Sequence, residues 1–372
     1  MRRIMKYRKQ VFLLCMLVLI VLLAVFFLFG RSGQLGRMIT YRTLGNRNHA
    51  EVFQFQGQGG EDFALFGNGI ALAGPGGLQV YNRAGELVYD ASAALRHPVL
   101  QVNDTFVLAY DIGGFDLFVG NRRELLRHHT TEGRIIDARI NENGWLTVSM
   151  EQIGRLGVIH VIDPDGNTRF EVESGTRHVI TADLAANNRT LAILFMAENA
   201  THVLWYDIRQ ADGQHVDPQY LFYRDDELFF DLWFTERNGA LAIISDSSIL
   251  HLSATGSRQR TYNFEGRHLR GFDANNGRAV IYLGQGQVGT RGEIILFNTN
   301  GTTQHLPVLG TLLDISLNDR FVAALFAEDL ILYRNLQEYT RFDRLQHHHH
   351  VLAREDGSVI ALAANRAQIL VP

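Results

Sequence analysis

The sequence predicts an all-β protein whose fold is a β-propeller, preceded by one N-terminal transmembrane helix. Three observations lead to this fold class. A pair of apolar strands recurs about every forty residues, and a long apolar run lies near the N-terminus. The composition of the 372 residues, 46% hydrophobic and 20% charged, is that of an ordinary folded chain.

Residues 1–10 are predicted to form a basic cytoplasmic tail. They hold five of the 35 lysine and arginine residues and no acid, so residues 11–372 carry 30 cations against 39 acids, a formal charge of −9. A nucleic-acid partner would need a basic footprint. The charge balance therefore argues against nucleic-acid binding.

Residues 11–29 are predicted to cross a membrane, because none of these nineteen side chains is polar and a helix of this length spans about 28 Å. A cleavable signal peptide is the alternative, but such peptides end in small residues, whereas residues 25–29 are bulky. Cationic flanks tend to stay cytoplasmic, and five cations precede the run while three follow it closely. We therefore expect a single-pass cell-membrane protein with its bulk extracytoplasmic and residues 30–50 as a stalk.

Beyond the stalk, eight units repeat. Each has an inner strand, a pair of apolar strands and a weaker outer strand. The equivalent positions at the start of each pair, called anchors below, are Ile70, Phe106, Leu146, Leu191, Leu241, Ala279, Val322 and Val359. Their mean spacing, 289/7 or about 41 residues, is typical of a four-stranded propeller blade. Residues 51–372 are thus predicted to form eight blades, or seven if one unit is misread.

Closure of the ring is predicted to use the first strand of the domain. The last unit runs out after its third strand at Pro372, whereas residues 51–55 form a strand without a unit of its own. Placing this strand at the outer edge of the last blade would complete that blade and remove an exposed sheet edge.

With its basic tail, its apolar run and repeats such as Gly76–Tyr81, the chain resembles bacterial single-span membrane proteins that carry an extracytoplasmic WD40-like or quinoprotein-like β-propeller, including a family without an assigned function. The resemblance covers nearly the whole chain. It implies a fold and a membrane location and transfers no catalytic residue. The Trp-Asp dipeptide of WD repeats and the Ser-x-Asp-x-Gly-x-x-Trp box of sialidase propellers are absent from the sequence.

Three motifs suggest a cofactor or a metal, but each lacks a necessary part. Gly284–Gly289 fits G-x-G-x-x-G, yet a strand follows where a dinucleotide site needs a helix. Asp163–Asn167 has alternating oxygen ligands but no downstream glutamate for calcium. His348 and His350 would share one face of a strand, without the further ligands of a defined metal site. We therefore predict no cofactor and no metal.

An acidic residue occupies nearly the same place on the inner strand of alternate units. The candidate ligand-binding residues in the central channel are these acids and one histidine: Asp62, Asp137, Asp231, Asp314 and His350. If the carboxylates face the axis, they form an anionic ring for a cation or a positively charged ligand. In the alternative interpretation, each accepts backbone hydrogen bonds from the neighbouring blade. The sequence does not decide the facing, because a shift of one residue reverses it.

The sequence favours a binding or scaffolding module over an enzyme. It contains neither G-x-S-x-G nor H-E-x-x-H, so no catalytic residue is assigned. The longest loops within the strand pairs, residues 151–157, 197–202 and 284–292, are predicted to emerge on one face, either as binding insertions or through neutral drift. We expect a protein or cell-envelope component as the partner on that face. The alternative is a propeller enzyme or ligand sensor that uses the channel carboxylates.

Overall fold

The structure is a computed structural model, and it describes most of the chain beyond the predicted stalk. The described residues are 50–55, 60–198, 200–210, 220–225, 227–236, 239–254, 259–286, 289–343, 345 and 347–372. The predicted tail and transmembrane helix, and nearly all of the stalk, lie outside these residues. None of the helices within the described ranges has the length and apolar character needed to span a membrane.

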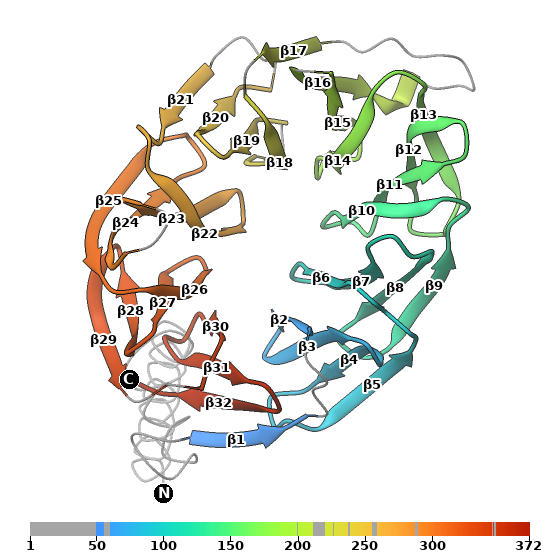
Figure 1. The fold of residues 1–372 in the computed structure, drawn as a ribbon. Helices are drawn as coiled ribbons and strands as arrows, with labels where there is room; N and C mark the ends of the chain where they lie inside the picture. The colour runs from blue at the N-terminus through green and yellow to red at the C-terminus, as the bar shows by residue number, and fades with distance from the viewer. Residues whose placement is uncertain are drawn as a thin grey trace, which may run out of the picture.

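The described strands form eight antiparallel sheets of four strands, arranged around a central axis (Figure 1). This confirms the predicted eight-bladed propeller. Blades 1–4 are β2(Asp62–Phe66), β3(Gly69–Gly74), β4(Gly77–Tyr81), β5(Leu87–Ser92); β6(Pro98–Val102), β7(Phe106–Asp111), β8(Asp116–Asn121), β9(Leu125–Thr130); β10(Arg134–Ile140), β11(Leu146–Gln152), β12(Arg155–Ile162), β13(Thr168–Ser174); β14(His178–Leu184), β15(Thr190–Ala197), β16(Ala200–Asp207), β17(Tyr220–Asp225). A short 3-10 helix, η1(Ile208–Gln210), follows β16.

The second half of the ring repeats the same order of inner, two middle and outer strands. Blades 5–8 are β18(Phe229–Phe234), β19(Leu241–Ser245), β20(Ser248–Leu252), β21(Gln259–Asn263); β22(His268–Asn275), β23(Arg278–Gly284), β24(Arg291–Phe297), β25(Thr303–Leu309); β26(Leu312–Leu317), β27(Phe321–Phe326), β28(Asp329–Arg334), β29(Gln337–Asp343); and β30(His350–Ala353), β31(Val359–Ala363), β32(Arg366–Leu370) with β1(Ala50–Gln54).

Blade 8 is closed by the first strand of the domain, as the sequence predicts. β1 pairs antiparallel with β32, and the N–H of Phe55 donates to the carbonyl oxygen of Asn365. The Phe55 side chain is buried with Ile70 of blade 1 and Ile369 of blade 8. The first strand thus covers the edge of the last blade, and the residue directly after it contributes a side chain to the interface that closes the ring.

The hairpin turns follow from residues that favour a left-handed backbone. In the turns that begin at Asn82, Asp163 and Asn298, the fourth residue is glycine, and its N–H donates to the carbonyl of the first. These glycines have φ between 75° and 91°, a region that other residues rarely adopt. The Asn or Asp at the first position and the Gly at the fourth therefore end one strand and start the next.

The hydrophobic core lies between the blades. The middle strands carry apolar side chains on both faces, and buried clusters join each described blade to its neighbour. One cluster combines Ile159 of blade 3 with Leu191 and Phe195 of blade 4. Another combines Val280 and Ile294 of blade 6 with Ala324 of blade 7. Because both faces of a blade are buried, the middle strands have continuous apolar runs, whereas an outer strand such as β9 alternates between half-buried and exposed residues.

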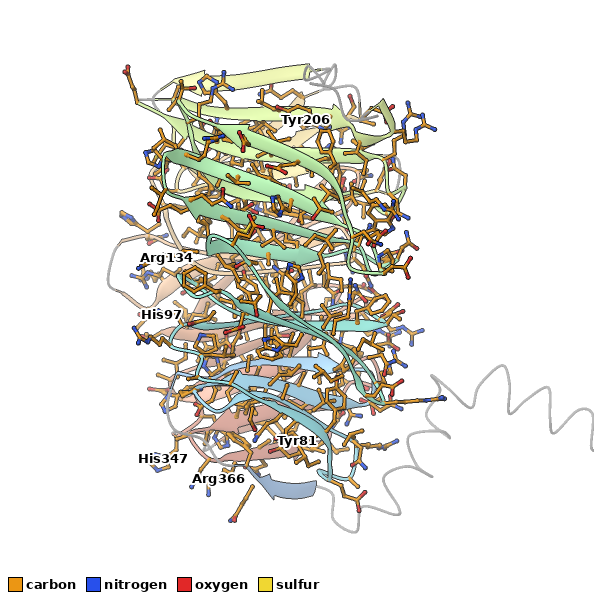
Figure 2. The ribbon with its side chains drawn as sticks, turned by 90° about the vertical axis from the view of Figure 1, so that its right-hand side faces the viewer. Tyr81, His97, Arg134, Tyr206, His347 and Arg366 are labelled. Carbon is orange, nitrogen blue, oxygen red and sulfur yellow. The ribbon has the colours of Figure 1, made fainter. Side chains whose placement is uncertain are left out.

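One face of the disc, here called the connector face, carries two kinds of loop. These are the hairpins between the two middle strands and the connectors from each outer strand to the next inner strand. His97, Arg134, His347 and Arg366 belong to such segments, and they lie along the same side of the molecule in Figure 2. The opposite face carries the other hairpin turns.

Deleting residues 1–60 is expected to destabilise the propeller, because it removes β1 and Phe55 and leaves β32 as an unpaired edge. We expect the melting temperature to fall by roughly 5 °C or more and the protein to self-associate on size exclusion. Deleting only residues 1–45 keeps β1 and serves as the control. Equal melting temperatures for the two deletions would contradict the closing role of β1.

Candidate functional site

The predicted site residues occupy equivalent positions around the central axis. Each pairs with the residue three positions after the anchor of its unit, as Asp62 does with Ala73 and Asp314 with Leu325. The eight equivalent residues form a first axial layer. They are Asp62, Leu100, Asp137, Thr181, Asp231, Gly271, Asp314 and His350. The acids of alternate blades are therefore true structural equivalents.

A second axial layer lies two residues further along each inner strand. It contains Ala64, Val102, Arg139, Asp183, Trp233, Asp273, Ser316 and Leu352. Residues two apart on a strand share a face, so both layers point the same way. Asp183 and Asp273 were missed by sequence reasoning. In blades 4 and 6 the first-layer residues are Thr181 and Gly271, and Asp183 and Asp273 occupy the second layer.

Three of the axial carboxylates accept a backbone hydrogen bond from the next blade around the ring. Asp62 accepts a hydrogen bond from the N–H of Leu100 at 2.9 Å. Asp314 accepts one from Val351 at 2.8 Å, and Asp273 accepts one from Leu317 at 2.6 Å. These are the inter-blade bonds of the alternative interpretation, and they determine the facing that the sequence left open. One oxygen of each of these carboxylates is occupied by a neighbouring blade.

The two second-layer carboxylates, Asp183 and Asp273, have raised pKa values. Burial raises the pKa of Asp183 to about 6, against the lowering effects of Arg139 and of a bond from Phe234. Burial also raises the pKa of Asp273 to about 7, although the bond from Leu317 favours the ionised form. Both groups therefore exchange a proton near neutral pH.

Arg139 connects three acids on one side of the axis. Its guanidinium lies 3.1 Å from Asp137, donates to the carbonyl of Leu232 at 2.5 Å and pairs with Asp231. The side chain is only 16% exposed. Burial alone would lower the pKa of Arg139, but Asp231, Asp137 and Asp183 raise it well above its usual value. The guanidinium thus joins blade 3 to blade 5 across the inner strand of blade 4.

Neutral partners extend this network to four blades. The hydroxyl of Tyr110 in blade 2 donates to Asp137 at 2.7 Å, and the hydroxyl of Thr181 in blade 4 donates to the other oxygen of the same carboxylate. Both oxygens of Asp137 are therefore bound within the protein.

The other side of the axis has no arginine among the described residues of the two layers. It has His350, whose Nδ1 lies 3.6 Å from Oδ2 of Asp314. The nearby carboxylate of Asp314 raises the pKa of His350, against the opposing effect of burial, and Asp62 adds to the rise. Asp314 is 29% and His350 51% exposed, so this side is the more accessible one.

Two of the other motifs lie in hairpins, and the prediction that His348 and His350 share one face of a strand is wrong. Gly284–Gly289 lies between the paired strands β23 and β24, with no helix after it. Asp163 accepts the N–H groups of Asp165 and Asn167 within a hairpin turn. His348 is buried and precedes β30, so it does not share a strand face with His350. Across the described ranges, no group of three His, Cys, Asp or Glu side chains could hold a metal ion.

The units that hold the three long loops have long middle strands. The middle strands have seven or eight residues in blades 3, 4 and 6, but five or six in the other blades. Because a strand extends about 3.3 Å per residue, these longer hairpins project further from the connector face. At the tip of the blade 3 hairpin, the side chain of Ile153 is fully exposed.

A comparison with protein families assigns the chain. Residues 40–329 match the model of a family of unknown function, DUF5711. The chain belongs to the DUF5711 family. A comparison with curated protein sequences gives no match.

Solved structures similar to this DUF5711 protein are β-propellers. BamB from Moraxella catarrhalis aligns with a TM-score of 0.52 at 13% identity, over 87% of this chain and 99% of that one. The C-terminal WD40 domain of Sif2 gives 0.60 at 11% identity, over 88% and 99%. The Dos1 propeller gives 0.56 at 10% identity, over 87% and 94%. At these identities the similarity supports the fold alone.

Replacing Arg139 with methionine is expected to destabilise the DUF5711 propeller by about 3 kcal/mol, because Asp137 and Asp231 lose their buried cation. The midpoint of urea denaturation measures this effect. Arg155→Met is the matched control, since Arg155 pairs with Glu173 on the surface, where both side chains are more than 40% exposed. The control is expected to cost less than about 1 kcal/mol. Similar losses in the two variants would contradict a special role of Arg139.

The raised pKa values of Asp183 and Asp273 predict that stability falls as pH increases. Both keep a proton in the folded state at pH values where an ordinary Asp, with a pKa of 3.8, is ionised. The free energy of unfolding should therefore decrease from about pH 4 to about pH 7 and level off above. In the double variant Asp183→Asn, Asp273→Asn, the difference in urea midpoint between pH 5.5 and pH 8 should shrink. An unchanged difference would show that these groups do not cause it.

Proposed function

We propose that this DUF5711 protein is a single-pass membrane protein whose extracytoplasmic propeller binds a partner protein through the connector face. The N-terminal apolar run and the charges that flank it support the membrane location and the orientation. The observation that carries the binding function is the uneven distribution of exposed apolar side chains.

Exposed large apolar residues gather on the connector face. Of eleven among the described residues, eight lie in its loops or at the strand ends that reach it: Ile112, Phe115, Ile153, Met196, Leu228, Phe230, Leu309 and Leu313. The other three, Leu87, Val88 and Leu126, lie on outer strands. Apolar and aromatic side chains form the centres of protein interfaces.

A rigid loop in blade 2 displays two of these side chains. Ile112 and Phe115 are 44% and 43% exposed. The loop between them is bound to blade 3 by two bonds, from the N–H of Gly113 to the carbonyl of Ile135 at 2.7 Å and from the N–H of Ile135 to the carbonyl of Gly114 at 2.9 Å. The N–H of Ile112 donates to the carbonyl of His97 at 3.0 Å. The apolar groups are therefore held in place before any partner binds, which lowers the entropy cost of binding.

The charges around this loop favour a protein over an anionic envelope polymer. Two exposed arginines, Arg96 and Arg134, are matched by two exposed glutamates, Glu132 and Glu151. A polyanion would require an excess of cations. A neutral setting around apolar side chains instead suits the surface of another protein.

The axial carboxylates support the alternative function less well. An enzyme or ligand sensor at the axis would depend on Asp62, Asp137, Asp231 and Asp314. Each of these carboxylates accepts hydrogen bonds from within the propeller. Their engagement leaves the connector face as the better-supported binding surface.

Photocrosslinking in cells tests the proposal. A photoreactive residue at position 112, 115 or 153 is expected to give one defined adduct with the same protein, whereas positions 87 and 126 give none. The triple variant Ile112→Ser, Phe115→Ser, Ile153→Ser should then bind that protein at least about tenfold more weakly, while its melting temperature stays close to that of the natural protein. Equal crosslinking at all five positions, or unchanged binding by the triple variant, would refute the proposal.

A further inference from the structure

The interface between blade 8 and blade 1 closes the ring, and its axial part differs from the interfaces described above. In blades 1 and 7, the first axial layer has an aspartate that accepts a backbone hydrogen bond from the next blade. In blade 8 the equivalent residue is His350. The group that faces blade 1 is therefore an imidazole, which is a titratable base, and not a carboxylate.

His350 lies between blades 7 and 1. Its Nδ1 is 3.6 Å from Oδ2 of Asp314 in blade 7. Its ring centroid is 5.9 Å from that of Phe63 in blade 1. Phe63 packs edge-on against Phe55, with their ring centroids 5.2 Å apart. Phe55 directly follows the closing strand β1. A continuous set of contacts thus joins blade 7, through His350, to the strand that closes the ring.

The charge of His350 changes these contacts. Asp314 on β26 and Asp62 on β2 are the acids that act on it, and the charge of Asp314 also acts on Asp273 on β22. His349 is its neighbour on the chain. An imidazolium is attracted to both carboxylates, whereas a neutral imidazole keeps only the packing against Phe63. Because His350 is half exposed, it can exchange its proton with solvent.

We propose that His350 is a pH-sensitive latch of the closing interface: when protonated it draws blades 7, 8 and 1 together, and when neutral it lets blade 8 loosen. This property of the ring goes beyond the proposed binding function and does not depend on it.

The direction of the effect follows from linkage. The nearby carboxylate of Asp314 raises the pKa of His350 in the folded state, against the effect of burial. A histidine with a raised folded pKa stabilises the fold at pH values below its unfolded pKa, and this stabilisation is lost as pH rises through the folded pKa. Blade 8 is therefore looser at pH 8 than at pH 6.

Hydrogen exchange of the full-length chain in detergent micelles tests the latch. Protection of peptides from β30–β32, corrected for intrinsic rates and divided by that of β11–β12, is expected to fall about two- to fivefold between pH 6 and pH 8, as for a partly exposed ion pair. The variant His350→Gln should abolish this fall. The matched control His349→Gln, which changes an exposed neighbour, should retain it.

Two further variants separate the latch from other titrations. Asp314→Asn keeps the imidazole but removes its partner, so it should also abolish the fall. Asp273→Asn removes the nearby carboxyl group with a pKa of about 7 and should retain the fall. The latch is refuted if the natural chain shows no fall, or if the fall persists in His350→Gln or in Asp314→Asn.

Discussion

The interaction on which this propeller depends is the hydrogen bond that an inner-strand carboxylate accepts from the next blade. Each blade completes its own backbone ladder, so ladder bonds do not join one blade to another. Apolar packing between blades supplies most of the burial energy, but it is non-directional. The bonds from Leu100 to Asp62 and from Leu317 to Asp273 set the positions of the inner strands of blades 2 and 7 relative to their neighbours. They add direction where packing alone leaves the blades free to slide.

Burying these carboxylates costs electrostatic free energy, and the two sides of the axis offset this cost in different ways. Burying carboxylates is unfavourable unless they are paired or protonated. On one side, Arg139 neutralises part of the charge and reaches from Asp137 to Asp231. On the other side, Asp273 takes up a proton near neutral pH, and His350 provides a titratable cation beside Asp314. Among the described residues of the two layers, the cation on one side of the axis is therefore a permanently charged arginine, and the cation on the other side is a titratable histidine.

The sequence predicted the blade count, the closing strand and four of the six axial acids, because these depend on a forty-residue period and on local turn chemistry. Asp183 was missed although it lies eight residues before its anchor, as Asp62 does. Two residues join β2 to β3, but five join β14 to β15. The same spacing from the anchor therefore places Asp62 in the first layer and Asp183 in the second. Register shifts in five inner strands add to this uncertainty. The reach of Arg139 across two blades is a tertiary property that local patterns do not contain.

The axis and the connector face are suited to different tasks for a physical reason. A group that binds a partner must be free to exchange its hydrogen bonds, whereas a group that holds blades together must not. The axial acids are engaged inside the ring, so changes there affect stability before they affect recognition. The loops of the connector face are themselves held by backbone bonds, such as those between Gly113, Gly114 and Ile135, while their apolar side chains remain exposed. Substitutions on these loops can therefore alter the proposed binding surface while the blades stay in place.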